Sequence, residues 1–532
     1  MPADSIPTED QAAWTCSAND ALQVSIVQPG GDGKLKTLST FYPQFTYPIF
    51  GDSETIFGYK GLMMQLRFAA HDLRSNVCIS YDEKFKAVED VAPADLNKAL
   101  KAFLPEASFT PLPKFEESVI NENDAKDFTP PGKMCRSYTK RKRNYEIWKG
   151  SLLDPKVQEL LDRIQIFVSL YIEGGTPIET DDFEWTLDRW TVFFLYEKLD
   201  EPPTPDASVY SFVGYVTTYR WYFFDRTGKR DEVVNTSFPY GETLDSASLP
   251  SRLRISQFLI LQPYQLSGHG TELYRTVHDA CLQDSTIREL TIEDPNEAFD
   301  ALRDTNDYTL LQPIFEQHIV SINVDPPSPK QERLRHPRFI PTSLLLPTET
   351  IRNIRRDYKI APTQFAHLLE MYLLSLIPMS HRGSHNVNLA RLRIQKSRAA
   401  NEHDRRYYWW RMLVKQRLYK RHRDMLIQLD RAERVEKLEE TLHNVEEGYE
   451  NLLKAFVLKT QAGSPLTLQK QETGAEAGET EGKGKGRTKR KYAVSDDDDG
   501  SDDSGPPPKP KAMQAKVEQN VVGSPKKAKI QR

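Results

Sequence analysis

The amino-acid sequence predicts an α+β/α-β protein in which a mixed, twisted sheet is flanked by helices. A small α+β domain precedes this sheet and a helical domain follows it. Two patterns support this fold class. Between Arg254 and Asp304 the hydrophobic spacing changes from strand to helix to strand to helix, and beyond Asp304 it is almost entirely helical. The chain has 532 residues, enough for about three domains of ordinary size.

Residues Trp14–Leu104 alternate short β-prone runs with turns, which indicates the small α+β unit. The segment Ala107–Pro131 is rich in proline and charge, and we expect it to connect two domains. Within the first unit the predicted strands are Ala21–Val27, Leu38–Tyr42 and Ile56–Ala70.

The next part of the chain mixes helix and strand patterns. Leu152–Ile172 has a helical period, and Trp190–Tyr196 is a strong strand. Val209–Phe224 and Ser256–Leu261 should be neighbouring strands of the sheet. The basic run Lys140–Arg143 fits either a solvated loop, the commoner case, or a patch for nuclear import or nucleic acid, and it stays unassigned.

The C-terminal part is predicted to be helical, with helices at Thr348–Tyr358 and Pro362–Leu376 and a connector at Phe339–Pro347. Ala390–Arg423 is basic with interleaved aromatic residues. Such a mixture can bind nucleic acid, but at helical spacing we expect the aromatic side chains to be core. An a/d-like stripe then predicts a packing helix, formed by Leu438, Leu442, Val445, Tyr449 and Leu452.

The central segment contains a loop suited to a phosphate. Gln265–Gly270 reads Q-L-S-G-H-G and lies between the strand Ile255–Leu261 and the amphipathic helix Thr271–Leu282. N–H groups at a helix N-terminus are unpaired and lie at the positive end of the helix dipole, and glycines let a phosphate approach them. A tight turn without ligand is the alternative. The spacing excludes a P-loop and the dinucleotide fingerprint.

A carboxylate is expected beside this loop. Arg288–Glu293 alternates like a strand, and Glu293 stands at its C-terminal end, the edge at which ligands bind in open α/β sheets. The residues Asp294–Glu297 then predict a helix start, with Asp294 as N-cap and Glu297 at the third helical position.

The motif Gln265-x-x-Gly268-x-Gly270 resembles the acetyl-CoA motif of the GNAT superfamily of N-acetyltransferases. A longer string, SQFLIL…GHG…LTIEDPNEAFDALRD, closely resembles the catalytic subunits of type B histone acetyltransferases. Supporting matches are FGDSETIFGYKGL at Phe50–Leu62 and VGYVTTYRWYFF at Val213–Phe224. The resemblance covers roughly residues 15–310.

This resemblance implies a GNAT-like sheet and a division of the chain. The expected parts are a flexible N-terminus (1–13), a histone-contacting α+β domain (14–130), a GNAT acetyltransferase domain (131–310), a C-terminal helical domain (311–462) and a disordered tail (463–532). The tail is polar and charged. Within it, Lys489–Lys491 and Pro525–Lys529 resemble nuclear-import signals, and Ser495 and Ser501 resemble sites of acid-directed kinases.

The expected chemistry requires a base, because a lysine ε-amine is protonated at pH 7. Glu293 is the predicted general base, at the position where the resembled family has it. Glu173, at the end of a long apolar run, and Asp294 are expected to assist. Glu173 fits an exposed helix end equally well, and Asp294 fits a helix cap.

The resemblance also implies where acetyl-CoA, the cosubstrate, is held. The acetyl group would lie along Phe258, Leu259 and Ile260, and Asn296 would add a further contact. Cys281 is expected in the core, so we predict direct attack in a ternary complex. The four scattered cysteines have no metal-binding spacing, and no metal is expected. The predicted pyrophosphate site consists of Gln265, Leu266, Ser267, Gly268, His269, Gly270 and Thr271.

The histone tail is implied to contact two segments. Asp52, Ser53 and Glu54 form an acidic turn that suits a basic peptide, although a solvated loop is the alternative. The second segment is Tyr219, Arg220 and Trp221, whose alternative role is cross-strand packing. Arg220 stands where a neutral polar residue is expected, so its side chain is the least secure of these contacts.

The implied function is acetylation of lysines near the start of the free histone H4 tail. The implied partners are histone H4, with histone H3 as a soluble complex, and a WD-repeat histone-binding subunit. The alternatives are a GNAT enzyme for another protein or small amine, and a non-catalytic histone chaperone. The net charge of −5 is small, and no direct DNA binding is expected. No apolar run reaches membrane-spanning length and no secretory signal is recognisable, which predicts a soluble intracellular protein. Together with the resemblance and the import-like signals, the expected location is cytoplasmic and nuclear.

Overall fold

The structure is a computed structural model. It describes residues 12–88, 91–121, 125–205, 207–222, 249–325, 342–383, 387–388, 393–394 and 400–462. The predicted tail 463–532, with its import signals, Ser495 and Ser501, lies outside these ranges, as do residues 1–11 and 223–248.

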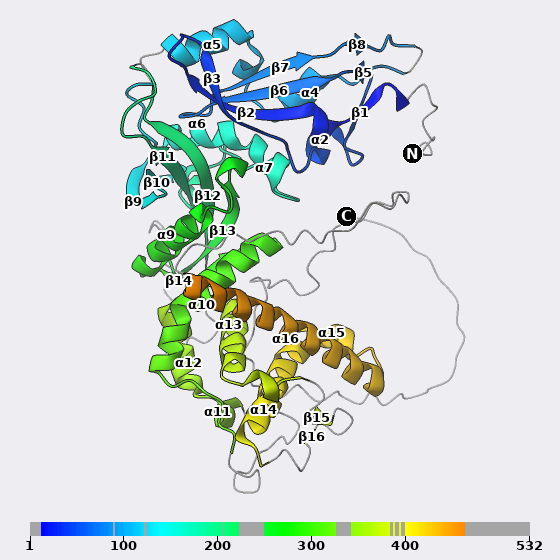
Figure 1. Cartoon of the computed structure of the whole chain (residues 1–532), viewed down its shortest axis with the longest axis vertical. Helices are drawn as coiled ribbons and strands as arrows, with labels where there is room; N and C mark the ends of the chain where they lie inside the picture. The colour runs from blue at the N-terminus through cyan, green and yellow to red at the C-terminus, as the bar shows by residue number, and fades with distance from the viewer. Residues whose placement is uncertain are drawn as a thin grey trace, which may run out of the picture. The chain divides into compact units, whose positions relative to one another are not determined.

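A six-stranded sheet forms the middle of the described chain, in the order β14-β13-β12-β11-β10-β9 (Figure 1). Neighbouring strands are antiparallel except β13 and β14, which are parallel. β12 and β13 are neighbours, as predicted. The strands are β9 (Lys133–Lys140), β10 (Arg143–Ser151), β11 (Trp190–Lys198), β12 (Tyr210–Tyr222), β13 (Ser251–Ile260) and β14 (Ile287–Ile292).

Helices cover both faces of this sheet. Helix α9 (His269–Gln283) buries Leu273, Val277 and Cys281 against one face. On the other face lie α6 (Pro155–Ile164) and α7 (Ile166–Tyr171), whose core is shared with the N-terminal unit. These two helices, divided at Gln165, replace the single helix expected over Leu152–Ile172. The Gln165 side chain accepts a hydrogen bond from the Ile178 N–H.

The N-terminal unit has a four-stranded sheet in the order β3-β2-β6-β7. Its strands are β2 (Leu22–Pro29), β3 (Leu35–Phe41), β6 (Met63–Ala69) and β7 (Ser75–Ser80), and its short helices are α2 (Ala18–Ala21), α3 (Tyr47–Phe50) and α4 (Leu96–Lys101).

Two predictions for this unit were wrong. Ile56–Ala70 is not one strand, because Gly58 (φ 102°) and Gly61 (φ 62°) take positive φ and interrupt it. It is divided among β4 (Thr55–Phe57), paired with β1 (Thr15–Ser17), β5 (Tyr59–Lys60), paired with β8 (Glu83–Lys84), and β6.

The segment Ala107–Pro131 is more than a connector. It contains most of the 3₁₀ turn η1 (Glu106–Phe109) and the helix α5 (Leu112–Asn121), which buries Phe115 and Val119 against the N-terminal sheet. The sequence concealed this helix because its apolar residues are few and proline precedes its core positions.

The remainder of the described chain is helical and has its own core. Tyr407 and Trp410 are fully buried in it, as expected, and the predicted stripe packs there through Leu442 and Tyr449. The long α16 contacts α13 and α14 (Figure 1). The helices are α10 (Glu297–Gln317), α11 (Thr342–Leu345), α12 (Thr348–Asp357), α13 (Pro362–Ser375), α14 (Glu402–Arg421), α15 (Arg423–Leu426) and α16 (Arg431–Ala462), and a small hairpin joins β15 (Val387–Asn388) and β16 (Arg393–Ile394).

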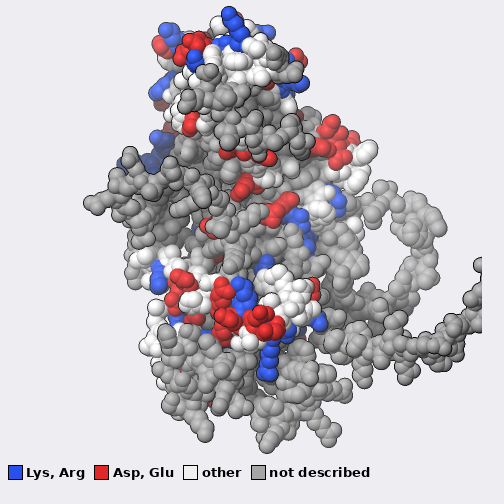
Figure 2. All heavy atoms as spheres, turned by 90° about the vertical axis from the view of Figure 1, so that its right-hand side faces the viewer, with Lys and Arg blue, Asp and Glu red and all other residues white. Residues whose placement is uncertain are grey.

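The described surface is mixed in charge. On the face drawn in Figure 2, basic side chains are interspersed with acidic ones, in keeping with the net charge of −5. Within the described ranges, no helix is both long and apolar enough to cross a bilayer.

A buried polar cluster joins α10 to α13. The Asp304 carboxylate accepts hydrogen bonds from Gln364 Nε2 at 3.0 Å and from His367 Nε2 at 3.1 Å. Burial alone would raise the pKa of Asp304, but the His367 charge and the hydrogen bonds from His367 and Gln364 outweigh it and hold the pKa below its ordinary value. The ionised carboxylate therefore stabilises the contact between these helices.

Replacing Asp304 by Asn should lower the free energy of unfolding at pH 7 by about 3 kcal/mol, because His367 and Gln364 lose a charged, buried acceptor. A lowered folded-state pKa means that this contribution is present above the unfolded-state value of about 3.9 and is lost as the pH falls through the folded-state pKa. Urea unfolding at pH 7 and at about pH 3 measures both effects. Glu349→Gln, which breaks an exposed pair with Arg352, is the control and should change little; equal midpoints for both variants at pH 7 would contradict the assignment.

Candidate active site

The two parallel strands β13 and β14 separate and form a fork. They are paired from Ser251 and Ile287 as far as Ile255 and Ile292. The last bond between them is from the Glu293 N–H to the Ile255 carbonyl, at 2.9 Å. Beyond this point β14 ends while β13 continues to Ile260.

A bulge in β13 causes this separation. Ile255 lies opposite Thr218 and Phe258 lies opposite Val216, so two residues of β13 face the single Thr217 of β12. The extra residue places Ser256 and Gln257 out of the regular ladder, and the Gln257 N–H donates to the Thr217 hydroxyl at 3.0 Å. A bulge bends its strand and redirects its side chains, so β13 turns away from β14 here.

The bend leaves an open strand edge inside the fork. Leu261 donates its N–H to the Val213 carbonyl at 2.9 Å. In an antiparallel ladder the direction of the peptide groups alternates, so the peptide groups of Phe258 and Ile260 point away from β12. The Ile260 carbonyl accepts from Gln265 Nε2 at 2.8 Å, which leaves Phe258 at the open edge. By the same alternation, the peptide group of Leu259, along which the acetyl group was also expected to lie, faces β12.

The glycine loop has a definite role for each glycine. Gly268 is the N-cap of α9 and has φ 79°, a conformation that favours glycine. A Cβ on Gly270 would lie 2.7 Å from Leu302 Cδ1 on α10. Gly270 thus lets α10 pack closely against α9, and Gly268 lets the loop turn into the helix; the predicted role of Gly270 in the approach of a phosphate stays a prediction.

His269 points away from the loop surface. Its Nδ1 lies 2.8 Å from the Tyr138 hydroxyl, and its ring centroid is 4.4 Å from that of Tyr145. Burial and the nearby charges of Lys140 and Arg141 lower the pKa of His269 to about 4. The imidazole is therefore neutral at pH 7, and only the backbone of His269 is placed to meet an anion.

Glu293 lies at the mouth of the fork. Its side chain is exposed, and its Oε2 accepts a hydrogen bond from the Ser256 hydroxyl at 2.6 Å. The bulge thus holds the predicted base in place. Ser256 was not among the predicted site residues. The signal in the sequence that could have indicated it is a polar residue within an apolar strand.

The predicted cap of α10 was wrong. Asp294 has φ 35°, whereas an N-cap has an extended backbone. The N-cap is Asn296, whose Oδ1 accepts from the Phe299 N–H at 2.9 Å. Asp294 instead turns the chain after β14, and both it and Asn296 are exposed beside Glu293.

Glu173 lies in the exposed loop after α7. The Gly174 N–H donates to the Tyr47 hydroxyl at 2.8 Å, and the Thr176 carbonyl accepts from Gln257 Nε2 at 2.9 Å. Consecutive bulge residues therefore bind two carboxylate-bearing elements: Ser256 binds Glu293, and Gln257 binds the loop of Glu173.

The three predicted contact residues of β12 divide between the two faces of the sheet. Trp221 is 45% exposed and packs edge-on against Tyr219, with ring centroids 5.2 Å apart. The Arg254 guanidinium lies 5.0 Å from the Trp221 ring. Arg220 points to the opposite face, where Nη2 pairs with Asp284 at 2.6 Å. Its side chain holds the turn between α9 and β14. Of the three residues, only Tyr219 and Trp221 therefore remain on the face where the histone tail was predicted to bind.

The acidic turn is also divided in role. Asp52 and Ser53 are exposed. Glu54 Oε1 accepts from the backbone N–H groups of Thr46 at 2.6 Å and Tyr47 at 3.2 Å, and its Oε2 accepts from Asn19 Nδ2 at 2.9 Å. Glu54 therefore holds the turn together, and Asp52 is the available carboxylate.

Comparison with known proteins gives the family. The family model described as "Histone acetyl transferase HAT1 N-terminus" matches residues 14–173. A protein of Aspergillus oryzae named "Histone acetyltransferase type B catalytic subunit" is 59% identical over 468 residues, which cover 88% of this chain and 90% of that protein. Proteins of the same name from Neurospora crassa (38% identical; 83% of this chain and 87% of that protein) and Cryptococcus neoformans (33% identical; 83% and 97%) also match.

The chain belongs to the family of type B histone acetyltransferase catalytic subunits. This confirms the resemblance on which the sequence interpretation rested and makes the chain an acyltransferase by family.

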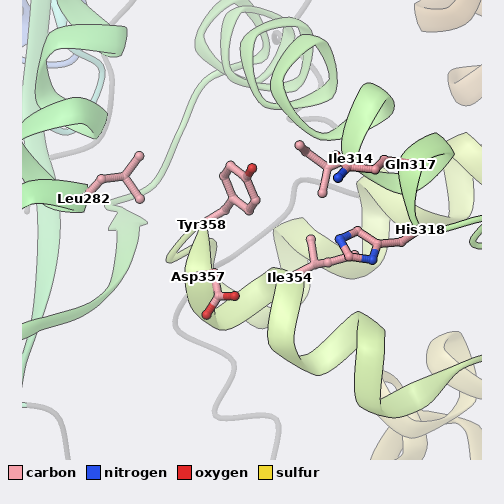
Figure 3. Close-up of a pocket in the computed structure, with 7 residues that line it drawn as sticks. All are labelled: Leu282, Ile314, Gln317, His318, Ile354, Asp357 and Tyr358. Atoms are coloured by element: carbon pink, nitrogen blue, oxygen red, sulfur yellow. The ribbon is translucent and has the colours of Figure 1, made fainter.

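A hollow of about 480 Å³ lies near the C-terminal end of α9 (Figure 3). Leu282, near the C-terminal end of α9, is part of its wall, and fifteen helical residues separate that end from the glycine loop by about 20 Å. We therefore do not assign the hollow to the fork. Its lining is Leu282, Ile314, Gln317, His318, Ile354, Asp357 and Tyr358.

The divided acidic turn can be tested by stability. Glu54→Gln should lower the free energy of unfolding by about 1 to 2 kcal/mol, because two backbone N–H groups lose a charged acceptor. Asp52→Asn is the matched control and should leave the unfolding midpoint unchanged, since its side chain is exposed. Thermal unfolding of both variants measures this; an unchanged midpoint for Glu54→Gln would show that its carboxylate does not stabilise the turn.

Proposed function

We propose that this acetyltransferase transfers an acetyl group from acetyl-CoA to a lysine ε-amine near the start of the free histone H4 tail. One observation carries the proposal: the exposed Glu293 carboxylate is held by Ser256 at the mouth of a fork whose β13 edge is open. The type B family supports histone as the substrate class, and the GNAT type of core is part of the proposal.

The residues of the fork fit acetyl-CoA. The Phe258 peptide group at the open edge offers hydrogen bonds to an extended amide chain. The N–H groups of the loop Gln265–Thr271 and the start of α9 favour a diphosphate. Asn296 can add its amide nitrogen, while its oxygen already accepts the bond that caps α10. The coenzyme supplies an activated acyl thioester.

Glu293 then removes the proton that makes the lysine unreactive. A lysine ε-amine has a pKa near 10.4 and is protonated at pH 7. A carboxylate takes this proton directly or through one water. Ser256 orients Glu293, and the Phe258 N–H is placed to stabilise negative charge developing on the acyl oxygen. Asp294 and Glu173 add negative charge near the incoming ammonium.

The tail is proposed to approach along Tyr219 and Trp221 towards Glu293, with Asp52 binding a basic residue. We further propose that the natural substrate is the soluble complex of histones H3 and H4. A WD-repeat histone-binding subunit would be the partner, and the enzyme would act in both cytoplasm and nucleus.

Glu293→Gln should reduce kcat on an H4-tail peptide by at least about a hundredfold, the usual contribution of a general base. The KM for acetyl-CoA and the melting temperature should stay unchanged, because the side chain is exposed. Glu297→Gln, an exposed carboxylate in the first turn of α10, is the control. If Glu293→Gln turned over at the wild-type rate from pH 6 to 9, Glu293 would not be the general base.

The same assay separates the alternatives. Acetylation of spermidine but not of the H4 peptide would indicate an enzyme for other amines. A chain that binds histone but not acetyl-CoA would be a chaperone.

Direct transfer predicts that no acetyl-cysteine forms. Cys281 is fully buried, and burial raises its pKa to about 12, so its thiolate is not available. Cys281→Ala should keep kcat while lowering the melting temperature through the cavity it leaves. Mass spectrometry of the enzyme quenched during turnover provides the measurement, with the exposed Cys135 as internal control; an acetylated Cys281 would overturn direct transfer.

A further inference from the structure

The basic run Lys140–Arg143, unassigned from the sequence, forms the tip of the β9–β10 hairpin. Arg141 (φ 50°) and Lys142 (φ 63°) both take left-handed backbone conformations. This is the geometry of a tight hairpin turn, and it places consecutive cations at the very end of the two strands.

The hairpin is attached to the start of α9. Tyr138 on β9 hydrogen-bonds His269, the first residue of α9, and Tyr145 on β10 packs against the same imidazole. At 3.3 Å per residue the turn begins about 7 to 10 Å beyond Tyr138. The long side chains of the turn can therefore reach the glycine loop.

Within the described part of the chain, three of the four cations of this run have no ion-pair partner. Arg143 pairs with Glu197 at 3.0 Å. Among the described residues, no carboxylate lies within ion-pair distance of Lys140, Arg141 or Lys142, and the last two are exposed. Arg275, on α9, also lies close to Lys140, but it has its own carboxylate neighbour, Glu272, at 3.9 Å.

The charges of the turn act on groups at the start of α9. Burial lowers the pKa of Lys140, and the charges of Arg141 and Arg275 lower it further, against the opposing effect of Glu272. The charges of Lys140 and Arg141 also help to lower the pKa of His269. The charges of Lys140 and Arg141 therefore act at the first residue of α9, and charge effects of this kind extend over about 8 Å at physiological salt.

We propose that Lys140, Arg141 and Lys142 bind the 3′-phosphate at the nucleotide end of the coenzyme. The inference rests on the coenzyme site proposed above and extends it. The α9 N–H groups suit the diphosphate, whereas a terminal phosphate carries about −1.5 to −2 charges at pH 7 and needs cations. Lysine ammonium and arginine guanidinium groups are the usual donors for such a group.

The test is calorimetric binding to the full-length chain. The ligands are acetyl-CoA, acetyl-3′-dephospho-CoA and acetyl-pantetheine. The variant is Lys140→Gln/Arg141→Gln/Lys142→Gln. The matched control, Lys86→Gln/Lys98→Gln/Lys114→Gln, removes three exposed cations far from the hairpin in sequence.

We expect the wild type and the control to bind acetyl-CoA about tenfold or more tightly than the dephospho form, a preference that weakens with added salt. The turn variant should lose this preference and bind both forms as the wild type binds the dephospho form.

Two results would overturn the assignment: an unchanged preference in the turn variant, or an equal loss of the preference in the control. A turn variant that loses affinity equally for both nucleotide forms but not for acetyl-pantetheine would assign the turn to the diphosphate instead. If the proposed coenzyme site itself were wrong, the result would be distinguishable, because the wild type would then bind neither acetyl-CoA nor its dephospho form.

Discussion

The bulge at Ser256 and Gln257 is the constraint on which the proposed site depends. One extra residue opposite Thr217 bends β13 away from β14 and opens its edge from Phe258 onwards. The same two residues bind the elements that carry Glu293 and Glu173. A bulge removes ladder hydrogen bonds, and here the Thr217 hydroxyl replaces one of them. Strand geometry and carboxylate placement therefore have one cause.

A second constraint acts on the start of α9. Gly268 turns the loop, Gly270 lets α10 approach through Leu302, and His269 is held by Tyr138. All three anchor the helix, so its N–H groups keep a fixed direction. Rigidity of this kind favours anion binding, because the donors need not be reordered when the ligand arrives. The cation-bearing turn of the β9–β10 hairpin shares the Tyr138 anchor.

Much of the fold was accessible from local pattern. The strands β11, β12, β13 and β14 and the helix α9 have strong periodicity, and the prediction of a mixed α/β chain is confirmed. The errors had local causes. Glycines with positive φ divided Ile56–Ala70, a weakly apolar helix was hidden in Ala107–Pro131, and Asn296 displaced Asp294 as the cap of α10 because the left-handed backbone of Asp294 cannot cap.

For the site, residue types and spacing alone determined the glycine loop before a helix and a carboxylate at the end of the next strand, because both are encoded within a few consecutive residues. Only the tertiary structure decided which side chains remain available there. The Glu54 carboxylate accepts from backbone N–H groups, and Arg220 is paired with Asp284. The peptide group of Leu259 bonds within the sheet to β12. Ser256, in contrast, donates to Glu293 and holds it at the site. These partners come from segments distant in sequence, and hydrogen-bond competition between such segments exists only once the chain has folded.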